Sequence, residues 1–234
     1  MGRLAQDFQA CFERDPAARR SCCGRLEVLF TYAGFHAIAL HRVTHFLHTL
    51  RIPFLPRVLS QINRFFTGVE IHPAASIGGG FFIDHGMGVV VGETTEIGEN
   101  VTLFQGVTLG GTGKETGKRH PTLGSNIVVG AGSKVLGNIS IGDNVYIGAN
   151  AVVLDDVQSN STVVGVPGRI VRYKGKRVSP AFELDHIHLP DPIKDRLQDL
   201  QEEIAAIEEH LKIAGKKIKE RTESGDMNND AEDV

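Results

Sequence analysis

Aliphatic residues recur at every sixth position through the middle of this 234-residue chain, and this period limits the possible folds more than any other feature. A period of six fits neither an α-helix nor a flat strand, whose side chains repeat every 3.6 and every 2 residues. It is typical of a coil of three short strands, in which the aliphatic side chains point inward and stacked coils bury one core. The residues of the period are Ile71, Ile77, Ile83, Val91, Ile97, Leu103, Leu109, Leu123, Val129, Val135, Ile141, Ile147 and Val153.

A glycine often follows the aliphatic residue of a repeat. Because glycine adopts backbone conformations that other residues avoid, we expect these glycines to let the chain bend at the corners of the coil. The glycines in question are Gly78, Gly92, Gly98, Gly110, Gly124, Gly130, Gly142 and Gly148.

Two irregularities interrupt the period. Ile83 and Val91 lie eight residues apart, and Leu109 and Leu123 lie fourteen residues apart, so that one corner is expanded into a loop. A regular prism accepts insertions only at its corners, where they point outward, and loops on a rigid scaffold often carry function. The two irregular corners are therefore the first places to look for chemistry.

The first irregular corner contains Asp84 and His85. Histidine is the common general base near neutral pH, and a carboxylate usually fixes its tautomer. Glu70 lies about one coil before His85, so the two can fall near the same corner. The spacing leaves two interpretations open: a catalytic base with its carboxylate, or a corner histidine that only caps a carbonyl group.

The second irregular corner contains Gly110, Gly111 and Thr112, followed by Lys118, Arg119 and His120. Its glycines suggest a phosphate-binding loop, but the spacing and the residue after the lysine do not fit the Walker pattern. The backbone amides of the loop could still hold a carbonyl oxygen or a pantetheine arm. The local sequence alone slightly favours a flexible hairpin without a ligand.

The flanking segments differ from the repeat. Asp15 followed by Pro16 is a helix N-cap with a first-turn proline, and residues up to about 66 have helical spacing. Near the other end, apolar residues alternate at steps of four and three over 193–218, which is a heptad pattern. We therefore expect a helical segment over 1–69, a β-helix over 70–172, a heptad helix over 191–221 and an acidic, disordered tail over 222–234.

Composition excludes several classes of partner and of targeting segment. The net charge of −3 provides no basic field for nucleic acid or for anionic membranes, so we expect neither as a partner. The N-terminus has no apolar run that could act as a signal peptide or a membrane span. The three cysteines form no disulfide framework, which suggests thiols in a reducing cytoplasm.

Four motifs carry a resemblance to a known family: IHPAASIGGGFFIDHGMGVVVGET, TLGGTGK, KRHPTLG and GVPGRIV. Together with RDPAARR and GFHAIALHR in the helical segment, they closely resemble bacterial and plant serine O-acetyltransferases. The resemblance extends over about 15–172. It implies a mainly β fold, a left-handed parallel β-helix of hexapeptide repeats; the handedness follows from the resemblance and not from the period.

The resemblance also implies roles for individual residues. His85 matches the catalytic base of the family, and Glu70 stands where many members carry the aspartate that pairs with it. The implied substrate-binding residues are Asp15 and Asp84, which hold serine, and Arg119 and His120, which recognise its carboxylate. The implied pantetheine groove consists of Gly110, Gly111, Thr112, Ala131 and Ala149, and it lies between neighbouring subunits.

The resemblance further implies a reaction and partners. The enzyme would transfer the acetyl group of acetyl-CoA to L-serine without a metal, in the first step of cysteine synthesis, and L-cysteine would inhibit it. It would form a homotrimer or hexamer. An acidic C-terminus ending in isoleucine often binds O-acetylserine sulfhydrylase in this family, and here the chain ends in Val234.

Three alternatives stay open on the sequence. Another acetyltransferase on the same fold would act on a sugar or a xenobiotic hydroxyl, but it needs no carboxylate site such as Arg119 and His120. A zinc hydratase of the γ-carbonic anhydrase type needs three converging histidines, whereas the repeats offer His85, His120 and, at their edge, His72. The third alternative is an inactive scaffold.

Overall fold

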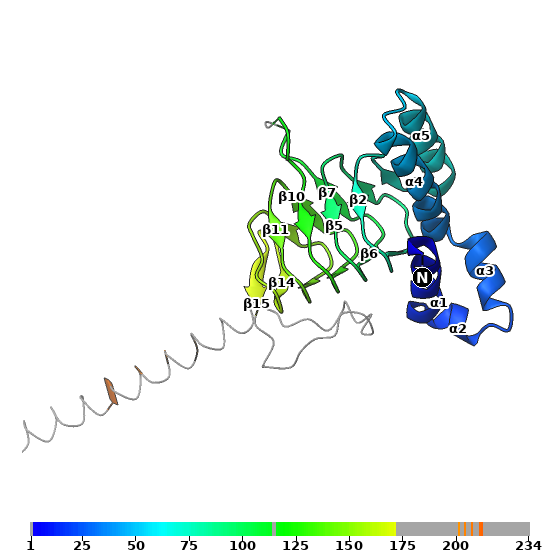
Figure 1. Cartoon of the computed structure of the whole chain (residues 1–234). Coiled ribbons are helices and arrows are strands. Elements are labelled where there is room, and N and C mark those ends of the chain that lie inside the picture. Colours follow the sequence, from blue (N-terminus) through cyan, green and yellow to red (C-terminus); the bar gives the residue numbers. More distant parts are fainter. Residues whose placement is uncertain are drawn as a thin grey trace, which may run out of the picture. The chain divides into compact units, whose positions relative to one another are not determined.

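The N-terminal part of the chain is helical. The structure, a computed structural model, describes residues 2–113 and 116–171, and beyond them residues 201, 204, 207, 211 and 212. Five helices precede the first strand and lie together at one end of the strands (Figure 1). They are α1 (Arg3–Arg14), α2 (Pro16–Arg20), α3 (Gly24–Thr31), α4 (Ala33–Thr49) and α5 (Leu55–Thr67).

Polar contacts fasten these helices to one another and to the strands. The carboxylate of Asp7 on α1 pairs with the guanidinium of Arg42 on α4 at 3.0 Å and accepts the backbone N–H of Phe81 at 2.9 Å. Asp15 caps α2, as the sequence predicts, by accepting the N–H of Ala17 at 2.7 Å. The helices are thereby held in a fixed position on the first coil.

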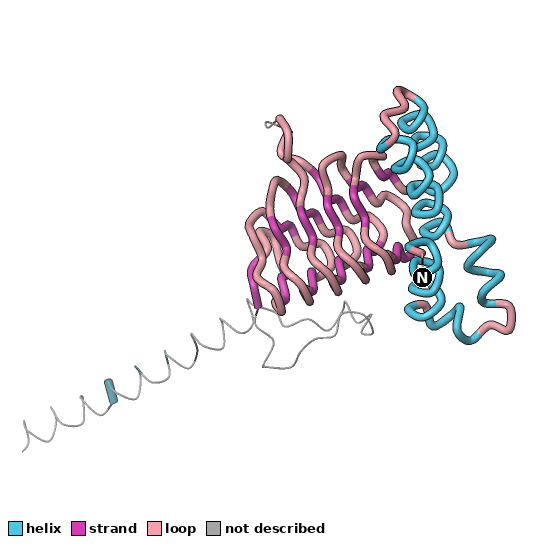
Figure 2. Tube along the Cα trace, viewed as in Figure 1, coloured by secondary structure: helices cyan, strands magenta, loops and turns pink. Residues whose placement is uncertain are grey.

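Short strands form three sheets, which Figure 2 shows as successive turns of one coil. Neighbouring strands within each sheet are parallel, apart from the antiparallel pair β14 and β15. Sheet A contains β1 (Glu70–Ile71), β4 (Val90–Val91), β7 (Thr108–Gly110), β10 (Lys134–Leu136) and β13 (Val152–Val153). Sheet B contains β2 (Ser76–Ile77), β5 (Glu96–Ile97), β8 (Thr122–Leu123) and β11 (Ser140–Ile141). Sheet C contains β3 (Phe82–Asp84), β6 (Thr102–Phe104), β9 (Val128–Val129), β12 (Tyr146–Ile147), β14 (Thr162–Val164) and β15 (Arg169–Val171).

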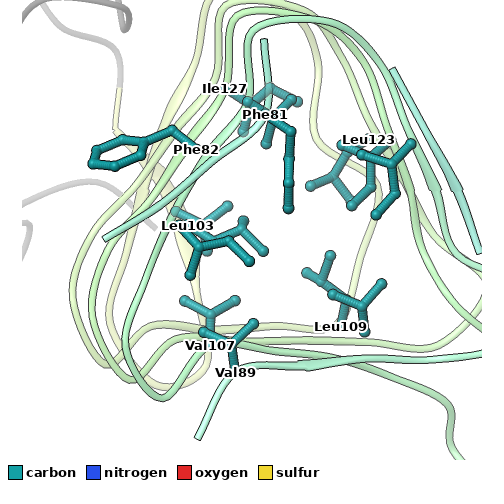
Figure 3. Close-up of a cluster of buried hydrophobic side chains, with 14 of the residues drawn as sticks. Phe81, Phe82, Val89, Leu103, Val107, Leu109, Leu123 and Ile127 are labelled. Atoms are coloured by element: carbon teal, nitrogen blue, oxygen red, sulfur yellow. The ribbon is translucent and has the colours of Figure 1, made fainter. Parts of the chain in front are cut away.

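The aliphatic residues of the six-residue period form the core, which confirms the predicted parallel β-helix. All of them are buried, and each stacks in register on its equivalent in the next coil, as Val91 does on Leu109. Figure 3 shows Leu103, Leu109 and Leu123, one from each sheet, pointing into the interior of the coil. Stacking apolar side chains in three columns gives one continuous core without long strands.

The glycines that follow the aliphatic residues serve a purpose other than the one expected. None of the eight has a positive φ, so they do not bend the corner by a left-handed backbone. A Cβ on Gly98 would instead lie 2.6 Å from the carbonyl oxygen of Gly124 in the next coil, and one on Gly78 would lie 2.4 Å from that of Gly98. Glycine is needed at these positions because the backbones of successive coils approach closely there.

Asparagines make the left-handed turns at the corner between sheets B and C. Asn100, Asn126, Asn144 and Asn160 have φ values of 57–61°, a region that asparagine tolerates better than most residues. Their side chains also connect the coils, since the amide of Asn144 donates to Asn160 at 3.1 Å and that of Asn126 donates to Asn144 at 3.3 Å.

The other two corners carry the predicted site residues. The corner that joins sheet C to sheet A, called the His85 corner, consists of residues 85–89, 105–107, 130–133 and 148–151. The corner that joins sheet A to sheet B, called the Arg119 corner, consists of residues 72–75, 92–95, 111–121 and 137–139. Within one chain, sheet A separates the two corners.

Most of the predicted heptad helix and the whole acidic tail lie outside the described residues. Residues 191–234 form a unit separate from residues 1–190. Of the predicted seam, Ile204, Ile207 and Leu211 are described, and they are helical and exposed. No helix among the described residues has the length and apolarity needed to cross a bilayer.

Candidate functional site

His85 occupies the turn that follows β3. Its φ of 58° places the backbone in the left-handed region, where the chain reverses from sheet C toward sheet A. The imidazole is 75% exposed, and its Nε2 lies 3.9 Å from a carboxylate oxygen of Asp84. The imidazole of a single chain is therefore open to solvent, with Asp84 as a neighbouring anion.

Glu70 lies at the same corner as His85, as the spacing predicts. Glu70 opens β1, its N–H donates to the carbonyl of Val89 at 2.9 Å, and Val89 follows the His85 turn. Its carboxylate, however, forms an ion pair with Nε of Arg64 on α5 at 3.3 Å. The structure thus brings Glu70 to the right corner with Arg64 as its ionic partner, and the pairing of Glu70 with His85 stays a prediction.

Asp15 is held by the helical segment on the side of sheet C. Its carboxylate accepts hydrogen bonds from the N–H of Ala17 and from the hydroxyl of Tyr32. The preceding residue, Arg14, donates to the hydroxyl of Thr102 on β6 at 2.9 Å. Asp15 therefore lies next to a residue that contacts sheet C, the sheet in which β3 ends at Asp84.

Arg119 and His120 lie at the Arg119 corner, bound to the coil that precedes them. The guanidinium of Arg119 pairs with the carboxylate of Glu93. His120 is 8% exposed and lies across Gly92, where a Cβ would be 2.0 Å from its Cδ2 atom. A side chain at position 92 would therefore displace the imidazole.

Thr94 connects the long loop to this corner. Its hydroxyl accepts the N–H groups of Arg119 and His120, each at 3.1 Å, and lies 2.9 Å from Nδ1 of His120. Its N–H donates to the same Nδ1 at 3.2 Å, and its carbonyl accepts from Nζ of Lys118 at 2.6 Å. Sequence reasoning missed Gly92, Glu93 and Thr94; their place at the corner one coil before the loop was the signal that could have revealed them.

Charges and burial set the protonation of this corner. The hydrogen bond from Arg119 holds the pKa of Glu93 below its ordinary value. Burial, helped by the nearby charge of Arg119, lowers the pKa of His120. Burial also lowers the pKa of His72 to about 4. At neutral pH the corner therefore contains a charged Arg119, an ionised Glu93 and neutral histidines.

The predicted pantetheine residues are divided between the two corners. Gly110, Gly111 and Thr112 end β7 and start the long loop, where Gly111 packs against Arg119. Ala131 and Ala149 lie at the His85 corner, two and three coils below His85, and the N–H of Asn150 donates to the carbonyl of Ala131. A groove containing all five residues needs the two corners to meet.

The predicted site residues thus fall into two groups on each chain. His85, Ala131 and Ala149 lie at the His85 corner, with Asp84 and Glu70 on the strands next to it. Gly111, Thr112, Arg119 and His120 lie at the Arg119 corner, with Gly110 at the end of β7, and sheet A separates the two groups within a chain. Among the described residues, no three histidine, cysteine, aspartate or glutamate side chains converge as metal ligands would.

Comparison with known proteins identifies the family. Residues 120–155 match the family model "Bacterial transferase hexapeptide (six repeats)". The serine acetyltransferase of Bacillus pumilus is 53% identical over 214 residues, which cover 92% of this chain and 96% of that protein. Two solved serine acetyltransferases superpose on it, one in complex with cysteine and one from Brucella abortus in complex with coenzyme A. Their TM-scores are 0.74 and 0.70, their identities 44% and 43%, and the matches cover 80% and 74% of this chain and 70% and 68% of theirs.

A relative that is more than half identical over nearly its whole length belongs to the same family as this chain. The chain belongs to the serine acetyltransferase family of hexapeptide-repeat transferases, and it transfers an acetyl group to serine.

Proposed function

We propose that the chain takes the acetyl group from acetyl-CoA and passes it to L-serine at a site completed by two copies of the chain. The observation that carries this proposal is the Arg119 corner. There a guanidinium and a neutral imidazole are held side by side by Glu93 and Thr94. Such a pair suits a carboxylate, which an amino acid has and a sugar or xenobiotic alcohol lacks.

The solvent exposure of His85 supports the role of a second copy. The imidazole of His85 is 75% exposed in the single chain, so it gains little electrostatic stabilisation from the protein around it. When the Arg119 corner of a neighbouring chain covers the His85 corner, solvent is excluded from the imidazole of His85. The two halves of the pantetheine groove then meet. Exclusion of water strengthens every electrostatic interaction inside the closed site.

In this site His85 acts as the general base. It removes the proton of the serine hydroxyl while the oxygen attacks the thioester carbonyl, and a backbone amide from 110–112 stabilises the oxyanion. Collapse of the intermediate breaks the C–S bond, and His85 returns its proton to the departing thiolate. Glu70 exchanges Arg64 for the imidazole and stabilises the imidazolium, while Asp15 and Asp84 hold the amino group and the hydroxyl end of serine.

The partners follow from the same chemistry. L-Cysteine carries the amino and carboxylate groups of serine, and it competes for the site as an inhibitor; a solved relative is a complex with cysteine. The enzyme is a homotrimer or hexamer in the cytoplasm, consistent with its free cysteines. The acidic tail that ends in Val234 binds O-acetylserine sulfhydrylase through its free carboxylate.

Thiol release from acetyl-CoA tests the proposed substrates. We expect rapid release with L-serine, slower release with L-threonine and L-homoserine, and background release with a galactoside or with serine methyl ester, which lacks the carboxylate. The control is the same assay without an acceptor. A galactoside turned over as fast as L-serine would contradict the proposal and favour a sugar acetyltransferase.

A further inference from the structure

Thr94 makes hydrogen bonds with three successive residues of the long loop, Lys118, Arg119 and His120. Its N–H, hydroxyl and carbonyl are all engaged by the loop over 118–120. The hydroxyl accepts two backbone N–H groups, which use both of its lone pairs. Its own proton is therefore directed to the remaining neighbour, Nδ1 of His120, at 2.9 Å.

This arrangement determines the tautomer of His120. A backbone N–H can only donate, so Nδ1 of His120 must be the acceptor of the 3.2 Å bond from Thr94. The hydroxyl proton adds a second donor to the same nitrogen. A ring nitrogen that accepts has no proton of its own, and a neutral imidazole then carries its proton on Nε2.

We propose that Thr94 positions His120 as a neutral imidazole with its proton on Nε2, so that the substrate carboxylate meets one cation, Arg119, and one uncharged donor. The inference rests on the proposed carboxylate-binding role of this corner. Thr94 does not touch the substrate in this account. It acts through His120, and it also holds the backbone N–H groups of both carboxylate-binding residues.

The electrostatics of the corner agree with an uncharged donor. Arg119 and Lys118 lie near the ring, and burial together with their charges disfavours a second proton on His120. Glu93 opposes this effect, but its carboxylate is engaged by Arg119. A protonated His120 would lose both hydrogen bonds from Thr94, because both nitrogens of an imidazolium are donors.

The test uses three variants of the full chain. Thr94→Val keeps the shape of threonine and removes the hydroxyl, Thr94→Ser keeps the hydroxyl, and Thr95→Val is a matched control. Thr95 is the next residue, and its buried hydroxyl has no hydrogen-bond partner among the described residues. We expect Thr94→Val to raise the KM for serine by about threefold to tenfold, the factor for one weakened hydrogen bond from His120 to the substrate carboxylate, and to change kcat less. Thr94→Ser and Thr95→Val should stay near the wild type.

A second readout does not depend on activity. In protein labelled with ¹⁵N-histidine, ring nitrogen shifts report which nitrogen carries the proton, and His120→Gln assigns the resonance. We expect Nδ1 of His120 to be unprotonated in the wild type. In Thr94→Val its shift should move, because the backbone N–H of residue 94 is then the one donor left to it of the two that Thr94 provides. A protonated Nδ1 in the wild type would overturn the proposal, as would a KM in Thr94→Ser as high as in Thr94→Val. If serine were not the substrate, the substrate assay would fail while the NMR result would stand.

Discussion

Replacement of His85 by asparagine is expected to lower kcat by at least about 100-fold, the smaller end of the contribution of a general base. Asparagine is a better choice than alanine because His85 has a φ of 58°. Alanine in the left-handed region costs about 1–2 kcal/mol, whereas asparagine accepts it more readily. The loss of activity in His85→Asn then reports the missing base and not a strained turn. Formation of O-acetylserine and the thermal unfolding midpoint are measured on the same samples.

The matched control is His36→Asn. His36 lies on α4 and bonds the carbonyl of Leu29 at 2.8 Å, and it has no part in the proposed site. We expect its turnover to match the wild type. A His85→Asn enzyme that kept more than about a tenth of wild-type turnover would contradict the assignment of His85 as the base.

Removal of the guanidinium in Arg119→Ala is expected to raise the KM for serine by roughly 10- to 150-fold. This range corresponds to a charge-assisted hydrogen bond of about 1.5–3 kcal/mol. The variant also leaves the carboxylate of Glu93 without its partner, which adds repulsion toward the serine carboxylate. The double variant Arg119→Ala/Glu93→Gln should therefore bind serine better than the single variant.

Acetyl-CoA and an unrelated arginine provide the controls for this prediction. The KM for acetyl-CoA should change much less than the KM for serine. Arg169→Ala removes an exposed arginine on β15 and should leave both constants unchanged. Equal increases for both substrates would show that Arg119 supports the loop as a whole and does not recognise the carboxylate.

The fold could be predicted from the sequence because its main signal is periodic. Thirteen aliphatic residues, at steps of six apart from the two irregular steps, specify a three-sided coil, and every one of them is buried in the structure. The purpose of the glycines was not predictable in this way. Gly98 follows an aliphatic residue and suggests a bend, but its backbone is needed for close contact with Gly124. Contact between coils depends on residues about one coil apart, which local propensity does not reveal.

Candidate site residues could be predicted at the corners where the six-residue period breaks. Those at corners of regular length could not be predicted from the period. His85 and the pair Arg119 and His120 lie at the two irregular corners, so the sequence marks them. Thr94 and Glu93 belong to a corner of regular length, and their importance comes from stacking beneath the inserted loop. The ion pair of Glu70 with Arg64 was also missed, because α5 and β1 come together only through the helical segment.

A mixing experiment tests whether the His85 corner of one chain and the Arg119 corner of another form one site. His85→Asn and Arg119→Ala are co-expressed with different tags, and the mixed oligomer is isolated by two affinity steps. In a mixed trimer one interface combines an intact His85 corner with an intact Arg119 corner, so we expect activity to return to about one third of the wild type at low serine concentration. Each variant purified alone serves as the baseline. A mixed oligomer no more active than the two variants alone would contradict the two-chain site.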